Sequence, residues 1–181
     1  MKKFLLSVSM LAAVITACVL TSCQDQDLDD VVAPATPVTS YTVPVATAAQ
    51  AAALPSGMAY QYQVNGQTVS AEDYQKAAAN ITSDTNFTIA VVDTATGTVV
   101  SSSSFVLKPM TADQAEAGQV PPIVNNVNGT TTSGYSIVIP TVTTNPTTGE
   151  TTASAGEAVE TEVEYNGDKV EPVHGGGGGK N

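Results

Sequence analysis

The two cysteines are the residues best placed for covalent chemistry, and both lie near the start of the 181-residue chain. Cys18 lies inside a mostly apolar, uncharged segment that runs from residue 4 to residue 20, behind two lysines. Cys23 follows small residues and precedes polar sequence, a setting that suits a processing enzyme of exported proteins. The apolar segment is short for a membrane-spanning helix. The sequence therefore predicts that residues 1–22 are removed and that Cys23 becomes the mature N-terminus.

This arrangement resembles a bacterial lipoprotein signal peptide, with Leu20-Thr21-Ser22-Cys23 as the lipobox. The resemblance implies that Cys23 is lipidated, and two or more acyl chains anchor a protein stably where one does not. Cys18 is a rival lipidation site, but the apolar pair that follows it favours Cys23. The other alternative is an ordinary cleaved secretory signal, which leaves Cys23 as a free thiol. With Cys23 lipidated, no cysteine remains for disulfide, metal or nucleophilic chemistry.

An acidic run from Asp25 to Asp30 follows this cysteine directly. It resembles the acidic export signal that follows the lipid-bearing cysteine in surface lipoproteins of Bacteroides-type bacteria. That resemblance implies a lipid-anchored protein of the outer membrane that faces the cell exterior. A solvated, self-repelling tether is the plainer interpretation of the same run. A calcium loop is a third interpretation, but the run lacks the turn glycine and the distal glutamate that such a loop needs.

The charge of the chain excludes whole classes of partner. Seventeen acidic residues oppose six lysines, no arginine is present, and the formal net charge is −11 at pH 7. Nucleic-acid binding needs a basic surface, and arginine is its principal reader, so we expect no nucleic-acid partner. Contact with anionic lipid surfaces is disfavoured for the same reason. The membrane contact that remains is the N-terminal lipid, and a glycan or a protein is the expected partner.

Acid–base and metal chemistry have few candidate residues. His174 is the only histidine and borders the glycine run 175–179, without a neighbour that could orient it. Glu160, Glu162 and Glu164 alternate, which places all three on the solvent face of a strand rather than across a cleft. We therefore expect a protein that is not an enzyme, with no catalytic residue, no metal site and no cofactor.

The tyrosines offer a possible surface for sugars. Aromatic rings exposed in a row would let a glycan stack on them, and four tyrosines come into question: Tyr60, Tyr62, Tyr135 and Tyr165. The chain has no tryptophan and few other large side chains. Buried aromatic rings contribute the most to a small core, so we expect these tyrosines in the core instead.

One short motif concerns modification. Asp93-Thr94-Ala95 resembles the O-glycosylation acceptor of Bacteroides-type exported proteins, which implies that Thr94 carries a glycan. The alternative is that Asp93 and Thr94 only build a tight turn, since short polar side chains of this kind bond to their own backbone.

Prolines punctuate residues 24–56, with alanine and threonine between them, and this composition favours an extended spacer. Within it, Thr47 and Gln50 fit a capping box for a short helix that ends at Leu54. Strand-like alternation begins only after Gly57. The predicted organisation is a lipoprotein signal peptide at 1–22, a tether at 23–56, one β-rich domain at 57–173 and a flexible glycine-rich tail at 174–181.

Two hairpins stand out among the short strands of the predicted domain. Residues 60–64 alternate and end at Asn65-Gly66, a strong two-residue hairpin signal. Residues 158–165 alternate as one strand before Asn166-Gly167, which predicts a second hairpin. Further strands are expected at 87–92, 98–100, 105–107, 123–127 and 135–139.

One helix within the domain is expected over 71–79, with Ser70 as its N-cap and with Tyr74 and Ala78 on one face. The strand–turn–strand at 91–100 resembles bacterial immunoglobulin-like and prealbumin-like modules. The predicted fold is therefore all-β, a small β-sandwich of that kind or a partly open barrel with one short helix.

These observations lead us to expect a non-enzymatic envelope lipoprotein with a binding or structural role. A glycan-binding accessory lipoprotein of a polysaccharide-uptake system would present an exposed aromatic row. A pilus-like or pore-associated assembly subunit would present an unpaired edge strand or form oligomers. An enzyme would need clustered carboxylates in a pocket.

Overall fold

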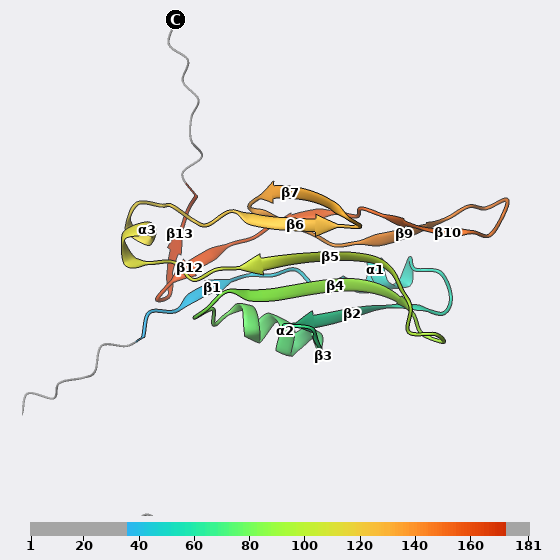
Figure 1. The fold of residues 1–181 in the computed structure, drawn as a ribbon, viewed down its shortest axis with the longest axis horizontal. Coiled ribbons are helices and arrows are strands. Elements are labelled where there is room, and N and C mark those ends of the chain that lie inside the picture. Colours follow the sequence, from blue (N-terminus) through green and yellow to red (C-terminus); the bar gives the residue numbers. More distant parts are fainter. Residues whose placement is uncertain (1–35, 173–181) are drawn as a thin grey trace, which may run out of the picture. The chain divides into compact units, whose positions relative to one another are not determined.

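Strands in two layers dominate the regular structure of residues 36–172, the part of the chain that the computed structural model describes (Figure 1). The larger layer is one antiparallel sheet of six strands in the order β3-β2-β4-β5-β6-β7. Its strands are β2 Met58–Val64, β3 Gln67–Val69, β4 Thr85–Asp93, β5 Val99–Leu107, β6 Ile123–Val127 and β7 Thr130–Gly134.

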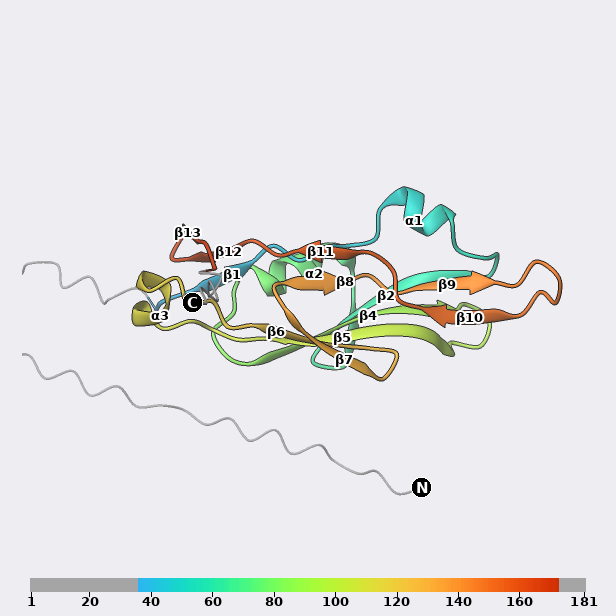
Figure 2. The same ribbon diagram turned by 90° about the horizontal axis from the view of Figure 1, so that it is seen from above.

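The second layer consists of three small antiparallel sheets, in the orders β1-β12-β13, β8-β11 and β9-β10. Figure 2 shows these sheets following one another along one face of the six-stranded sheet. Their strands are β1 Thr39–Tyr41, β8 Ser136–Val138, β9 Thr141–Thr144, β10 Thr151–Ser154, β11 Ala158–Glu160, β12 Val163–Tyr165 and β13 Asp168–Val170. The prediction of a small all-β sandwich is confirmed.

Three Asn-Gly turns join neighbouring strands. Their asparagines, Asn65, Asn128 and Asn166, have φ of 50°, 50° and 52°, and each following glycine also has positive φ. Two consecutive left-handed residues give a type I′ turn, whose twist matches that of the strands it connects. The hairpins predicted at 65–66 and 166–167 are confirmed as β2–β3 and β12–β13, and the third turn joins β6 to β7.

A chain of aromatic rings occupies the core between the two layers. Ring centroids lie 5.1 Å apart for Tyr62 and Tyr74, 5.2 Å for Tyr74 and Phe87, and 5.7 Å for Phe87 and Phe105. Aromatic pairs at these separations add stability beyond the apolar area that they bury. The large side chains that the sequence has in short supply are therefore concentrated at one place.

Helix α2 (Ala71–Ala78) agrees with the predicted helix in its cap and in its buried face. The Ser70 hydroxyl accepts a 3.0 Å hydrogen bond from the amide of Asp73, which satisfies one of the free donors of the first turn. Tyr74 and Ala78 are both fully buried. Figure 1 shows α2 beside β2, on the side of the sheet where β3 forms the edge.

The four tyrosines that were candidates for a sugar platform pack into the core instead. Tyr62 is buried, and Tyr60, Tyr135 and Tyr165 are half-buried against the same apolar cluster. The Tyr60 hydroxyl donates a 3.1 Å hydrogen bond to the carbonyl of Pro140, in the opposite layer. The expectation that these rings serve the core is confirmed.

The folded unit includes residues before Gly57, which corrects the predicted domain start at that residue. Strand β1 pairs with β12, and Tyr41 and Val43 are each only 2% exposed in the core. A short strand flanked by prolines has the same composition as a proline-rich spacer, and only its distant partner strand separates the two. Residues 36–56 of the predicted tether therefore belong to the folded unit, and residues 23–35 lie outside the described residues.

Two further short helices share one N-terminal motif. In α1 (Ala48–Ala52), the Thr47 hydroxyl accepts from the amide of Gln50 at 3.2 Å, and the Gln50 side chain accepts from the amide of Thr47 at 2.8 Å. This is the predicted capping box, and it is confirmed. The same kind of box begins α3 (Ala112–Glu116), a helix that the sequence analysis did not predict.

Two predicted strand boundaries are wrong. Strand β5 is continuous where the sequence predicts two short strands, because Ser101 and Ser103 pair with β4 and are buried between the layers. The strand predicted over 158–165 is divided at Thr161, because β11 pairs with β8 whereas β12 pairs with β1. At the division, the amide of Thr161 donates a 2.9 Å hydrogen bond to the carbonyl of Tyr135.

Candidate functional site

The residues on which the anchoring prediction depends lie outside the described part of the chain. Cys23 and the acidic run after it belong to these residues, so lipidation of Cys23 stays a prediction. His174 also lies outside the described residues. Within residues 36–172 no group of three or more histidine, cysteine, aspartate or glutamate side chains could hold a metal ion. No helix in the same residues combines the length and the apolar character needed to cross a membrane.

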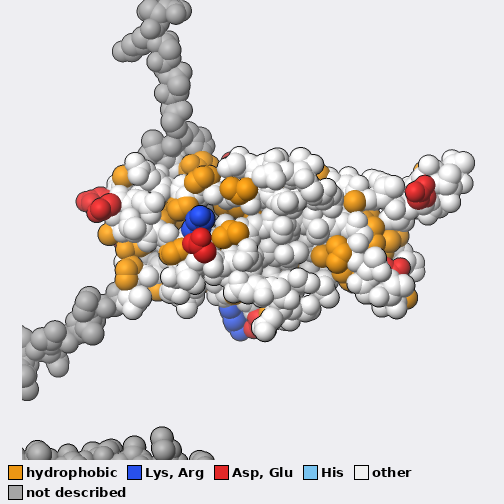
Figure 3. Space-filling model, in the orientation of Figure 1, with side chains coloured by type: hydrophobic (Ala, Val, Ile, Leu, Met, Phe, Trp, Pro, Cys, Tyr) orange, Lys and Arg blue, Asp and Glu red, His pale blue; other side chains and the backbone are white. Residues whose placement is uncertain are grey.

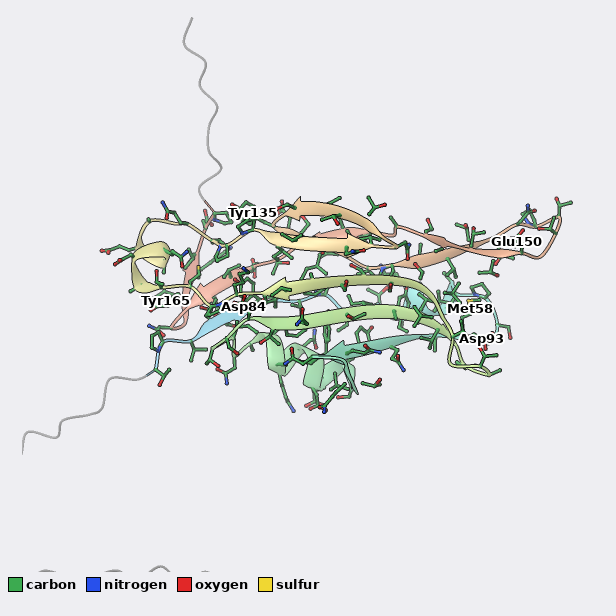
Figure 4. The ribbon with its side chains drawn as sticks, in the orientation of Figure 1. Met58, Asp84, Asp93, Tyr135, Glu150 and Tyr165 are labelled. Atoms are coloured by element: carbon green, nitrogen blue, oxygen red, sulfur yellow. The ribbon has the colours of Figure 1, made fainter. Side chains whose placement is uncertain are left out.

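Thr94 lies in the exposed turn between β4 and β5, at the end of the sheet where Figure 4 labels Asp93. The Asp93 carboxylate accepts from the amides of Ala95 at 2.8 Å and Thr96 at 3.0 Å. The amide of Thr96, followed by that of Ala95, holds the pKa of Asp93 below its ordinary value. The Thr94 hydroxyl donates to the carbonyl of Gly57 at 2.9 Å. Asp93 and Thr94 therefore build the turn, and glycosylation of Thr94 stays a prediction.

The three alternating glutamates do not form an acid pair. Glu160 ends β11, Glu164 belongs to β12, and Glu162 lies between these strands; all three are exposed. The ammonium of Lys169 lies 3.3 Å from the Glu162 carboxylate, beside an open hollow of about 380 Å³. The hollow also borders the buried Thr161. Exposed carboxylates on neighbouring strands suit a solvated surface better than glycoside hydrolysis, which needs a buried acid with a raised pKa and a second carboxylate across a cleft.

A row of uncharged hydrogen-bonding side chains crosses the outer face of the six-stranded sheet. In β2, β4, β5 and β6, the residues that alternate with them are buried or half-buried in the core. Each strand contributes one member, and each is the direct cross-strand partner of the next: Thr68, Gln63, Thr88, Ser104, Asn126 and Thr131. We call these six residues the neutral row. Figure 3 shows this face, on which uncharged side chains predominate.

At the margin of this face, a positive and a negative side chain neutralise each other's charge. Lys108 follows β5 and Asp84 precedes β4, and their side chains form an ion pair at 3.6 Å. Beside the neutral row, Val124 is half exposed, with 50% of its surface accessible. The outer face of the six-stranded sheet is therefore close to neutral, although the protein as a whole has a strongly negative net charge.

The neutral row ends at β7, an edge strand whose only partner among the described residues is β6. Its residues 130–133 are exposed, and the strand contains no charge and no proline. Thr130 pairs with Val127 around a two-residue turn, so Thr130 and Thr132 direct their backbone groups toward β6. Thr131 and Ser133 direct theirs outward, and no backbone hydrogen bond from the described residues reaches them.

Three other sheet edges in the described residues are guarded in the ways that natural proteins use. Strand β3 has only three residues, and β13 carries the charges of Asp168 and Lys169. Beside β1, Ile81 exchanges backbone hydrogen bonds with Thr39 at 2.8 and 3.4 Å. Strand β7 has five residues and none of these protections.

Sequence reasoning missed both the neutral row and the β7 edge. The signal for β7 was present, because Asn128-Gly129 after the strand at 123–127 implies a returning strand. The neutral row had no such signal, since its members come from six strands and share no spacing along the chain.

No family model, curated protein or solved structure matches this chain. Its function is therefore argued from the geometry of the β7 edge and the neutral row, together with the predicted lipid anchor.

Proposed function

We propose that the protein is a non-enzymatic lipoprotein of the outer membrane, anchored through Cys23 and displayed at the cell surface, where it acts as a structural assembly subunit. The predicted signal peptide and lipobox support the anchor. The open β7 edge is the observation that supports the assembly role, because an unpaired strand is a template for addition of another strand.

The aromatic residues favour assembly over the glycan-binding alternative. An accessory protein that captures glycans by stacking would expose a row of rings. Every tyrosine and phenylalanine among the described residues is either buried or packed against the core cluster. The six-stranded sheet instead exposes hydroxyl and amide side chains, together with free backbone groups at β7.

The corrected domain boundary bears on how such a subunit would be held. With the lipid on Cys23, residues 23–35 are the stretch of sequence between the lipid and the first described residue. Thirteen residues span at most about 45 Å when fully extended. Copies anchored in one membrane would therefore be kept within a thin layer, in which neighbouring domains meet often.

Fractionation of cells that express Cys23→Ser tests the anchor. We expect the wild-type chain and a Cys18→Ser control in the outer-membrane fraction, and the Cys23→Ser variant absent from it. Protease treatment of intact cells should release the wild-type domain if it faces outward. Recovery of Cys23→Ser in the outer membrane at the wild-type level would contradict lipidation at this residue, and full protection from protease would contradict surface display.

A further inference from the structure

We propose that the β7 edge binds the β7 edge of a second copy of this chain, so that two six-stranded sheets continue into one. The inference deepens the proposed assembly function by naming the partner, and it rests on that function. It starts from β7, an edge strand of the six-stranded sheet that has five residues and carries no charge.

The hydrogen-bonding pattern of the β6–β7 hairpin fixes how two such edges would meet. Outward backbone groups belong to Thr131 and Ser133. An antiparallel pair centred on Thr132 places Thr131 of each copy opposite Ser133 of the other, and these residues exchange backbone hydrogen bonds. The two-fold axis passes between the two Thr132 residues, so that Thr132 of one copy lies opposite Thr132 of the other. Such an interface is isologous and closed, as most homodimer interfaces are.

The proposed contact between two β7 strands, which we call the seam, brings threonine and serine side chains opposite one another. Hydroxyl side chains are already paired in this way within the chain. In the β9–β10 hairpin, the hydroxyl oxygens of Thr143 and Thr152 lie 3.1 Å apart, and those of Thr144 and Thr151 lie 3.3 Å apart. Cross-strand hydroxyl pairs of this type add a modest stabilisation to a sheet. A seam of threonine and serine would reproduce the same contacts between two copies.

Charge explains why a second copy fits this edge better than it fits the rest of the surface. Two molecules that each carry a strongly negative net charge, −11 for the full sequence, repel each other over most approaches. Strand β7 and the neutral row contain no charged residue. The two-fold axis is perpendicular to the sheet, so the neutral rows of the two copies join end to end on the same face.

The size of the contact predicts where pairing occurs. A stable interface between free proteins buries about 1,200–2,000 Å², and two short strands meeting at their edges bury less. Pairing is therefore weak between dilute molecules. Anchoring in one membrane raises the effective concentration, and weak contacts then become populated without any new interaction. We expect pairs on the membrane rather than in dilute detergent.

A single cysteine at residue 132 detects the pairing in the full chain on intact cells. Opposed residues that are not hydrogen-bonded lie about 4.5 Å apart at Cα, within the range that a disulfide spans. Thr132 also borders a hollow of about 350 Å³, which leaves room for the bond. We expect Thr132→Cys to give a disulfide-linked dimer after mild oxidation, identified by mass spectrometry as two copies of this chain.

Two controls make the result specific. Thr68→Cys places an equally exposed cysteine on β3, the opposite edge of the same sheet, and should give several-fold less dimer. Thr131→Pro, added to Thr132→Cys, removes an outward N–H that β6 does not use and should suppress the dimer while the fold is retained. Equal cross-linking at residues 68 and 132, adducts to other proteins only, or a dimer insensitive to Thr131→Pro would overturn the proposal.

The outcome separates this inference from the proposed function. A chain that is correctly anchored and displayed but cross-links no better at residue 132 than at residue 68 refutes the pairing alone. A chain that cross-links at residue 132 yet is absent from the outer membrane refutes the anchored, surface-displayed function and leaves the pairing intact.

Discussion

Replacing Tyr74 by phenylalanine tests how the core treats a polar group that has no partner. The Tyr74 ring is fully buried between Tyr62 and Phe87, and its hydroxyl makes no hydrogen bond with any described residue. Burial, reinforced by the nearby Tyr62, raises the pKa of the Tyr74 hydroxyl. The unfolded chain lets water bond to this hydroxyl, so the folded state loses that hydration without compensation.

The magnitude follows from two opposing effects. Leaving a buried hydroxyl without a partner costs about 1–3 kcal/mol. Deleting its oxygen leaves a void on the order of 10 Å³, which at about 24 cal/mol per Å³ costs only ~0.2 kcal/mol. The first effect dominates, so Tyr74→Phe should raise the free energy of unfolding by about 1 kcal/mol or more. For a domain of this size the Tm should rise by roughly 2–5 °C.

Urea unfolding of the purified protein measures this change, and Tyr41→Phe is the matched control. The midpoint should rise for Tyr74→Phe while the slope m stays constant. The Tyr41 hydroxyl is also buried, but it donates a 2.7 Å hydrogen bond to the Lys108 carbonyl. Its removal should lower the free energy of unfolding by about 1–2 kcal/mol. If both variants destabilise the protein equally, the reasoning about the unpaired Tyr74 hydroxyl is refuted.

Three further predictions concern the backbone, a helix cap and alkaline pH. A Cβ at Gly156 would collide with the carbonyl oxygen of Ile139, so Gly156→Ala should lower the free energy of unfolding by on the order of 1–3 kcal/mol. Thermal unfolding measures this change, and an unchanged Tm would contradict it. Ser70→Ala removes the hydrogen bond to the Asp73 amide and should cost about 1 kcal/mol, measured by urea unfolding, with the α2 amides exchanging faster with solvent. Burial raises the pKa of the Tyr41 hydroxyl from 10.0 to about 12. The stability that the neutral Tyr41 side chain contributes is therefore complete below pH 10 and is lost as the pH rises toward 12. If the tyrosinate absorbance of the folded protein were fully developed near pH 10, the burial argument would be wrong.

Local patterns predicted the elements whose cause is local. Asn65-Gly66 and Asn166-Gly167 give hairpins because both residues of each turn tolerate positive φ. Ser70 and Thr47 mark helix starts because their hydroxyls reach an amide only three residues further on. The all-β class followed from the same short strands and turns.

Pairing between distant segments decided what the sequence analysis missed. Residues 39–41 are a strand only because residues 163–165 are available to pair with them. Ser101 and Ser103 have the composition of a loop, yet the neighbouring strand and the layer above bury them. At the candidate site, Thr131 and Ser133 gained significance only through their position at the last edge of the sheet. No spacing along the chain encodes that position.

The pairing of β1 with β12 bears on the export that we propose for this chain. The first strand of the folded unit is hydrogen-bonded to a strand more than a hundred residues later, with Thr39 opposite Tyr165. A chain that crosses a membrane from its N-terminus cannot place β1 until nearly all of it has emerged. Contacts so far apart in sequence also form slowly. The polypeptide would thus remain incompletely folded during translocation and complete its folding only afterwards. Truncated chains that end before residue 165 would lack part of β12, the strand with which β1 pairs.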